Sequence, residues 1–410
     1  MSIPKEFLWG FAPVRNEQIE GAPKADGRGP SIWDTCYDIP GKIADESDGS
    51  IACDSYNHTH EDIVLLKETG AKAYCFSNAW PRIIPLGGLF YKVSVDDLLA
   101  EGMVPFVTLF HWDLPDALDK RYGGFLNKKF VADYAHYAGI LFEAMPRVKH
   151  WSTINEPWCS SILRYKHGQF APGHTTYRTK SSMGDSSREC WQIGHNLLLA
   201  HGTVVKIYRE ETMLKKGGDI GITLNGDSAY PWDPNDSHDI ESAEHKLEFS
   251  IPAQLGDRLH SWIPEEIALV QGSNRFYGIN HYTANYMHKT TPAEADDFLG
   301  NVDTLFESEA GQSIGPETHK RYDFPKIYCT ENGTSLKGEN EMLRKQILDD
   351  ECRADLNMKG YLTCSLMDNF EWAEVYEARF SVAFVDYEGG QKRYLKKSAK
   401  IIGPLFESLI

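Results

Sequence analysis

The hydrophobic positions of this chain fall into short apolar runs that are rich in β-branched and aromatic residues. Segments with a helical spacing of apolar residues separate these runs, and such alternation predicts βα units around a parallel sheet. Because eight runs follow one another without a linker or repeat, we predict one domain over residues 1–410, an α/β fold of the closed (β/α)8 TIM-barrel type. The expected strands are Phe7–Ala12, Ala73–Trp80, Val104–Phe110, Val148–Asn155, Ile220–Leu224, Phe276–Tyr282, Lys326–Glu331 and Tyr361–Met367.

The helical segments between these runs differ in quality. Three have a clear apolar stripe and predict outer-ring helices: Asp62–Gly70, Phe130–Phe142 and Ile193–Tyr208. A fourth, Ser94–Gly102, is short and starts with a serine suited to capping a helix. Residues 250–264, 316–325 and 350–360 show little helical pattern, so we expect parts of the outer ring to be thin.

The composition limits the kinds of molecule that this protein is expected to bind. A formal net charge of −17 argues against nucleic acid or an anionic membrane surface, whereas neutral sugars remain allowed. The N-terminus lacks a secretion-signal pattern, and no apolar run reaches the roughly 18 residues of a membrane span. The eight cysteines show no CxxC spacing, which favours reduced thiols and a cytoplasmic location. Nothing in the sequence sets an oligomeric state.

Two of the predicted strands end on a glutamate. Lys326–Gly333 carries Glu331, and His150–Pro157 carries Glu156. Taken alone, each acid is also typical of a solvated loop. Presented together at the carboxyl ends of barrel strands, they form the pair of carboxylates that cleavage of a glycosidic bond requires. In a retaining mechanism, the two carboxyl groups would lie about 5–5.5 Å apart.

Five ordered motifs extend this interpretation: Phe110-His-Trp-Asp113, Thr153-Ile-Asn-Glu-Pro157, Tyr277-Gly-Ile-Asn-His-Tyr282, Tyr328-Cys-Thr-Glu-Asn-Gly333 and Ser365-Leu-Met-Asp-Asn-Phe-Glu-Trp372. With them the chain resembles family 1 glycoside hydrolases, and most of all the intracellular fungal-type β-glucosidases, from Phe7 to about Pro404. The resemblance implies a (β/α)8 fold, a retaining mechanism, no metal or cofactor, and a small β-glucoside or cello-oligosaccharide as substrate. It makes Glu156 the acid/base and Glu331 the nucleophile.

The same resemblance implies a substrate-binding shell. Side chains that would hydrogen-bond glycone hydroxyls are Gln18, His111, Asn155 and Glu371, with Trp372 as a further donor. Around them, Tyr282 would donate to the nucleophile, Asn280 would share its face of the strand, and Trp112 would shape the pocket. The aglycone site would be formed by Trp158 and Leu163.

Some positions depart from the family pattern next to the nucleophile. The second strand reads Tyr-Cys75-Phe-Ser where the family has Tyr-Arg-Phe-Ser, so a cation is replaced by a thiol. Losing that cation predicts a raised pKa for Glu331. Cys364 stands where the family has a tryptophan under the sugar ring, and one extra residue precedes Gln18.

Four regions are shorter than is usual in the family: Gly88–Tyr91, Ser250–Gln254, Thr318–Tyr322 and Arg353–Met358. Shortening of the outer ring predicts exposed apolar surface and lower stability. A second hypothesis is therefore a weak or inactive barrel that binds sugar or acts as a scaffold. Another hypothesis is a thiol cluster of Cys75, Cys329 and Cys364 beside the nucleophile, with Cys329 on the face of Glu331, that binds a soft metal or is oxidised.

Overall fold

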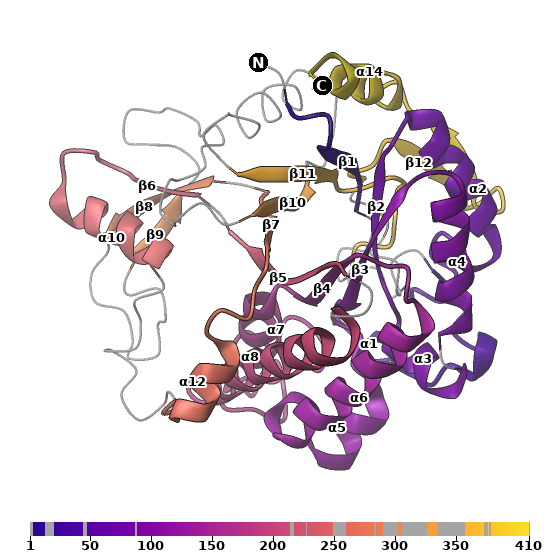
Figure 1. Cartoon of the computed structure of the whole chain (residues 1–410). Helices are drawn as coiled ribbons and strands as arrows, with labels where there is room; N and C mark the ends of the chain where they lie inside the picture. The colour runs from indigo at the N-terminus through magenta and orange to yellow at the C-terminus, as the bar shows by residue number, and fades with distance from the viewer. Residues whose placement is uncertain are drawn as a thin grey trace.

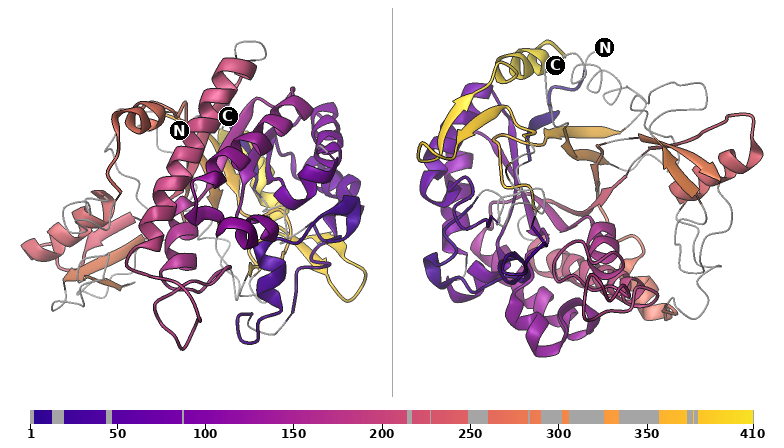
Figure 2. Two further views of the ribbon diagram at one scale, coloured as in Figure 1. Left: turned by 90° about the horizontal axis from the view of Figure 1, so that it is seen from below. Right: turned by 180° about the vertical axis from the view of Figure 1, so that it is seen from behind.

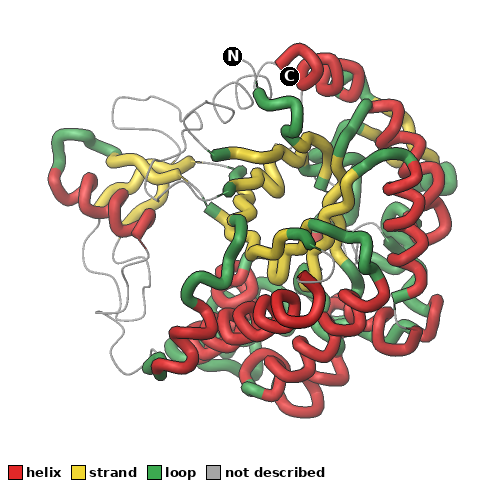
Figure 3. Tube along the Cα trace, in the orientation of Figure 1, coloured by secondary structure: helices red, strands yellow, loops and turns green. Residues whose placement is uncertain are grey.

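The strands of the core close into a parallel barrel, shown in a computed structural model that describes residues 3–12, 20–43, 47–86, 88–213, 217–226, 228–248, 260–282, 284–289, 302–305, 326–333, 357–372, 376 and 379–409. Eight strands are neighbours in the order β1-β11-β10-β7-β5-β4-β3-β2 (Figures 1 and 3). Each corresponds to one of the eight predicted runs, so the barrel is confirmed. The strands are β1 Leu8–Phe11, β2 Ala73–Ser77, β3 Val104–Phe110, β4 His150–Asn155, β5 Asp219–Asn225, β7 Tyr277–Asn280, β10 Ile327–Asn332 and β11 Met358–Thr363.

The ring closes through β1, which pairs with β2 on one side and with β11 on the other. Gly10 lies opposite Ala73, and a Cβ at this position would stand 1.8 Å from the Ala73 carbonyl oxygen. Only glycine permits this approach of two backbones. The predicted strand 73–80 ends early, at Ser77, because Trp80 already begins a helix.

One apolar layer lies inside the barrel and another lies outside it, between the strands and the helices. The interior is filled by a small cluster that includes Cys75, Phe106, Phe276, Tyr328 and Leu362. The rings of Phe106 and Tyr328 meet edge to face with centroids 5.0 Å apart, so the barrel is packed rather than hollow at this level. A much larger cluster fills the space between the strands and the outer helices.

Helices cover much of the outer side of the barrel, chiefly on the right and lower sides of the view in Figure 1 (see also Figure 2). The three strongest helix predictions are confirmed as α2 Ser55–Thr69, α6 Lys129–Ala144 and α8 Glu189–Ile207. Other helical segments are η1 Ala25–Gly27, α1 Ile32–Tyr37, α3 Trp80–Leu86, α5 Asp116–Tyr122, η2 Gly124–Leu126, α7 Pro157–Tyr165, the π-helical η3 Tyr208–Met213, α10 Ser237–Glu248, α12 Pro264–Val270 and α14 Ala399–Leu409.

The predicted helix start at Ser94 is wrong. Helix α4 spans Leu89–Ala100, so Ser94 lies inside it and its hydroxyl donates to the Phe90 carbonyl one turn earlier, at 3.2 Å. A serine hydroxyl can satisfy a backbone carbonyl within a helix as well as cap one, which is why the capping pattern misled.

One shortened region leaves apolar surface exposed, as expected. At Gly88–Tyr91 the chain passes almost directly from α3 to α4, and Ile84, Leu89 and Val93 on these two helices are 52%, 62% and 51% exposed. The other three shortened regions lie outside the described residues, apart from 357–358 at the start of β11. So do most of the segments predicted to hold little helix.

Two smaller sheets accompany the barrel and were not predicted. A three-stranded sheet of β6 Ser228–Pro231, β8 Ala284–Lys289 and β9 Val302–Leu305 lies to one side together with α10 (Figure 1). A hairpin of β12 Ala383–Asp386 and β13 Lys392–Leu395 follows the last barrel strand. Within the described ranges, no helix is both long and apolar enough to cross a membrane.

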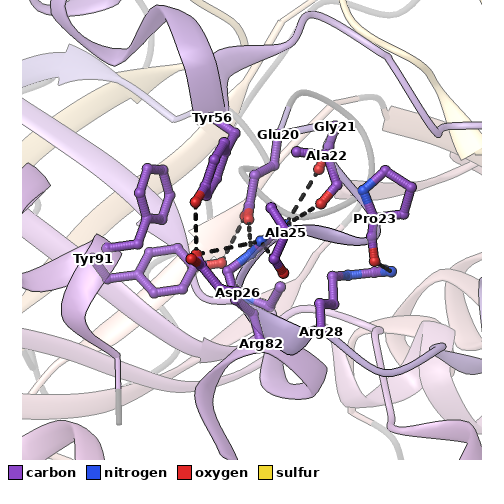
Figure 4. A network of polar contacts seen from close by, with 12 residues as sticks. Glu20, Gly21, Ala22, Pro23, Ala25, Asp26, Arg28, Tyr56, Arg82 and Tyr91 are labelled. Atoms are coloured by element: carbon purple, nitrogen blue, oxygen red, sulfur yellow. Dashed lines mark hydrogen bonds and ion pairs between the residues drawn. The ribbon is translucent and has the colours of Figure 1, made fainter. Parts of the chain in front are cut away.

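A buried ion pair fixes the segment that follows β1. Arg82 of α3 and Glu20 are each 2% exposed and form a salt bridge, and the guanidinium also donates to the carbonyls of Ala22 and Ala25 (Figure 4). The Tyr91 hydroxyl donates to Glu20 at 2.6 Å. These contacts fasten residues 20–25 to helices α3 and α4.

Candidate active site

The two predicted catalytic acids lie at the carboxyl ends of their strands. Glu156 follows β4 directly, takes a left-handed conformation with φ 47°, and precedes Pro157 at the first position of α7. Glu331 is the next-to-last residue of β10. Both glutamates therefore lie at the same end of the barrel, where enzymes of this fold carry their reactive groups.

Asn280 connects Glu156 to β10, the strand that carries Glu331. Its amide nitrogen donates to Glu156 Oε1 at 2.9 Å and to Asn155 Oδ1 at 3.0 Å. Its amide oxygen accepts from the Thr330 hydroxyl at 2.8 Å. Asn280 is thus held from β10 while it orients the carboxylate of Glu156.

Glu331 is held by neutral donors. The Tyr282 hydroxyl donates to Glu331 Oε2 at 2.8 Å. Burial, followed by the negative charge of Glu156, raises the pKa of Glu331 well above its ordinary value, and hydrogen bonds from Tyr282 and Asn280 oppose this rise. Among the residues that the structure describes, no lysine or arginine forms an ion pair with Glu331. This agrees with the raised pKa that the loss of the family arginine predicts.

Cys75 occupies the position of that arginine. Its thiol is buried inside the barrel, 3.8 Å from the Thr108 hydroxyl, and burial raises its pKa to about 12, with Glu331 adding to the rise. The thiol is therefore neutral at physiological pH. Burial, together with the charge of Glu331, also raises the pKa of the Cys364 thiol well above its usual range.

The predicted thiol cluster is not assembled as expected. Cys329 belongs to the layer between barrel and helices, whereas Cys75 belongs to the barrel interior. An irregularity in the pairing of β10 with β7 falls between Cys329 and Glu331, so the two-residue period does not carry from one to the other. Across the described part of the chain, no group of three or more His, Cys, Asp or Glu side chains is arranged to hold a metal ion.

His111 and Asn155 form the next part of the site. The Asn155 amide nitrogen donates to His111 Nε2 at 3.0 Å, which places the imidazole proton on Nδ1. Burial lowers the pKa of His111 to about 3, with a contribution from Arg164. His111 is therefore neutral, and Nδ1 remains the donor side of the ring.

Indole rings form a wall beside His111. The Trp372 ring lies 4.8 Å from that of Trp112 and 4.7 Å from that of Trp33. Trp112 also donates from Nε1 to the Asn155 carbonyl at 3.2 Å. Next to Trp372, the carboxylate of Glu371 accepts from the Asn369 amide at 2.8 Å. Trp112 and Trp372 thus lie beside Asn155 and His111, and Glu371 is near enough to Glu331 for its negative charge to add to the rise in the pKa of Glu331.

The predicted aglycone residues lie on α7, the helix that Glu156 precedes. Trp158 and Leu163 are both partly buried against the main core. Gln18 lies outside the described residues. The predicted residues that the structure describes are therefore close to the barrel mouth or on the helix that begins there.

Other residues of the site were not predicted. Cys159 hydrogen-bonds to Glu156 from the first turn of α7, and Thr330 holds Asn280. Arg164 is fully buried, donates to the Trp112 carbonyl at 3.0 Å, and lies 5.6 Å from the Trp112 ring. Burial lowers the pKa of Arg164 to about 10. The adjacency of Thr330 to Glu331 was an available signal, whereas a helical arginine gives none.

Comparison with known proteins identifies the family of this chain. The model of glycosyl hydrolase family 1 matches residues 1–408, and the chain belongs to this family. β-Glucosidase 1B of Phanerodontia chrysosporium is 44% identical over 472 aligned residues, covering 100% of this chain and 86% of the relative. The structure of a β-glucosidase from the fungus Humicola insolens in complex with glucose is 54% identical, with a TM-score of 0.93 and coverage of 100% and 99%. That of β-glucosidase 2 from Trichoderma reesei in complex with Tris is 49% identical, with a TM-score of 0.92 and the same coverage.

Proposed function

We propose that this protein is a retaining β-glucosidase that releases terminal β-D-glucosyl residues from small β-glucosides and cello-oligosaccharides. The observation that carries this is the pair Glu156 and Glu331 at one end of the barrel, joined through Asn280 and with Tyr282 bound to Glu331. Membership of the family supports it, as do relatives that are themselves β-glucosidases. The same relatives favour an enzyme over an inactive sugar-binding barrel.

The proposed reaction has two steps. Glu331 attacks the anomeric carbon and forms an ester bond to it, while Glu156 gives its proton to the departing glycosidic oxygen. Water then enters, Glu156 takes its proton, and the hydroxide oxygen displaces Glu331 from the anomeric carbon. The sugar leaves with its original β configuration after two inversions.

The surroundings of each acid suit these roles. Glu331 must be ionised to attack, and the donors Tyr282 and Asn280 favour the ionised form against burial and the neighbouring negative charge. Asn280 also donates to Oε1 of Glu156 and so orients this carboxyl group for its proposed role in proton transfer.

Sugar recognition is assigned to the shell around these acids. We propose that His111, through Nδ1, and the side chains of Asn155 and Glu371 bind glycone hydroxyls together with Gln18, and that Trp372 and Trp112 flank the ring. Trp158 and Leu163 are proposed to contact the aglycone. None of the seven cysteines in the described ranges forms a disulfide, which supports the further proposal of a cytoplasmic location.

Hydrolysis of an aryl β-glucoside tests this proposal. The wild-type protein is expected to release the phenol with retention at the anomeric carbon, and the Glu331→Gln variant is expected to lose this activity by several orders of magnitude because the nucleophile is absent. Equal, background rates for both proteins would contradict it. Glucose binding without hydrolysis would favour the sugar-binding alternative.

A further inference from the structure

The segment that carries Glu371 and Trp372 leaves β11 and has little regular structure of its own. It spans Cys364–Trp372, and backbone hydrogen bonds of β-bridge type attach its first part to the start of β12. Its far end carries Glu371, which accepts from Asn369, and Trp372, which has a left-handed φ of 51°. A segment of this kind holds a precise side-chain position only when other groups fix it.

Asp368 lies in the middle of this segment and is 0% exposed. Its Oδ2 accepts from Arg379 Nη1 at 2.7 Å, and its Oδ1 accepts from Lys396 Nζ at 2.7 Å and from the Ser381 hydroxyl. Its backbone is held as well, because the Cys53 thiol donates to its carbonyl at 2.8 Å and its N–H donates to Ala383 at 2.9 Å. One carboxylate thus joins the segment to residues on both sides of the β12–β13 hairpin.

The position of Asp368 gives these contacts a functional consequence. It precedes Asn369 directly and Glu371 by three residues, so the amide that orients the Glu371 carboxylate starts from a fixed backbone. On the same stretch, Trp372 is packed against Trp33 and Trp112. A shift of the backbone at Asp368 would therefore move Glu371 relative to the two catalytic acids, which stand on other strands.

We propose that Asp368, with Lys396 and Arg379, is a positioning site that sets the sugar-binding geometry of Glu371 and Trp372. The inference rests on the proposed function, since it assigns Glu371 to the glycone. Asp368 touches no substrate in this account; it acts through Glu371. Its two cations are 29% and 35% exposed, so each can turn to water when the carboxylate is removed. The fold is therefore expected to tolerate the change better than the binding site does.

The chain offers a matched control. Asp219, at the opposite end of the barrel, also holds one arginine and one lysine, Arg275 at 3.1 Å and Lys326 at 3.0 Å. Its replacement removes one arginine and one lysine contact far from the sugar-binding residues, from a carboxylate that is 15% exposed rather than 0%. Comparing Asp368→Asn with Asp219→Asn therefore separates positioning of Glu371 from a general loss of stability.

The experiment measures kcat and KM for an aryl β-glucoside and, by calorimetry, Kd for glucose. Asp368→Asn is expected to raise KM and Kd by about ten- to a hundredfold, as misplacement of a binding group by about 1 Å does, while Asp219→Asn leaves both within about twofold. In a Glu371→Gln background, Asp368→Asn is expected to add less than about twofold, because coupled residues are not additive.

Two further variants keep the test decisive if Asp368→Asn does not fold. Lys396→Met removes one cation and is expected to raise KM and Kd in the same direction, and Lys396→Arg is expected to restore them. Unchanged KM and Kd in folded Asp368→Asn or Lys396→Met, or an equal loss in the presence and absence of Glu371, would overturn the inference. Absence of hydrolysis in wild-type protein would defeat the proposed function alone, because Kd for glucose still reports on the positioning of Glu371.

Discussion

A cation at position 75 should favour the ionised form of Glu331, the proposed nucleophile. In the present protein, Cys75 is a buried, neutral thiol within electrostatic range of Glu331, and the pKa of Glu331 is raised. A guanidinium there would favour the ionised carboxylate. We therefore predict that Cys75→Arg shifts the acidic limb of the kcat/KM profile to lower pH.

The size of the shift follows from Coulomb's law. Opposite unit charges about 5 Å apart at an effective dielectric constant of about 20 attract by about 3 kcal/mol. Since one pKa unit corresponds to about 1.4 kcal/mol, the acidic limb of the kcat/KM profile should move to lower pH by about two pH units. Below the present limb, kcat/KM should then rise by about one to two orders of magnitude.

The larger side chain has a cost that a control can measure. Cys75 is packed among Phe106, Tyr328 and Leu362, and overfilling a packed interior typically costs about 1–3 kcal/mol. Cys75→Met lengthens the side chain without a charge, so it should show the loss of stability but no shift of the limb. The assay is hydrolysis of an aryl β-glucoside from about pH 4 to pH 9, with thermal melts of all three proteins. An unmoved limb in folded Cys75→Arg would refute the electrostatic reasoning.

Three further predictions concern stability. Burial raises the folded-state pKa of Glu331 well above its ordinary value of 4.5, so the stability that this group contributes is fully present below that value and is lost as pH rises through the folded-state pKa. Glu331→Gln should therefore raise Tm more at pH 8 than at pH 4. An equal change in Tm at both pH values would contradict this prediction. Arg82→Met should lower the free energy of unfolding by about 3–5 kcal/mol in a denaturant titration, because it leaves Glu20 buried without its cation. Because Ile84, Leu89 and Val93 expose apolar surface, we expect the Tm of this protein to be no higher than about 45–65 °C. A thermal melt well above that range would refute the predicted low stability.

The barrel could be predicted because its strands are buried on both faces. Such strands read as continuous apolar runs, and the alternation with helices leaves few other folds. The strand ends were harder to predict. The strand predicted over 73–80 was too long because a buried apolar residue such as Trp80 fits a helix as well as a strand, and Trp80 begins α3. The β12–β13 hairpin was missed because Lys392 and Arg393 give it a polar pattern, although Arg393 pairs with buried Asp62 across the fold.

The chemistry of the site could be predicted further than its geometry. Glu156 and Glu331 follow from strands that end on an acid, and the motifs point to Tyr282 and Asn155. That Asn280 bridges Asn155 and Glu156 depends on contacts between residues more than a hundred positions apart, which no local pattern reveals. The face of Cys329 was wrongly predicted because a strand irregularity breaks the two-residue period.

We propose that Glu331 is the residue that becomes covalently bonded to the sugar. Incubation with a 2-deoxy-2-fluoro-β-glucoside carrying a good leaving group slows the second step more than the first, so the glycosyl-enzyme accumulates. Mass spectrometry of the digested protein should find one fluoroglucosyl group on the peptide that contains Glu331, and none in Glu331→Gln. A label on another residue, or an unlabelled protein that still hydrolyses aryl β-glucosides, would contradict the assignment of Glu331 as the nucleophile.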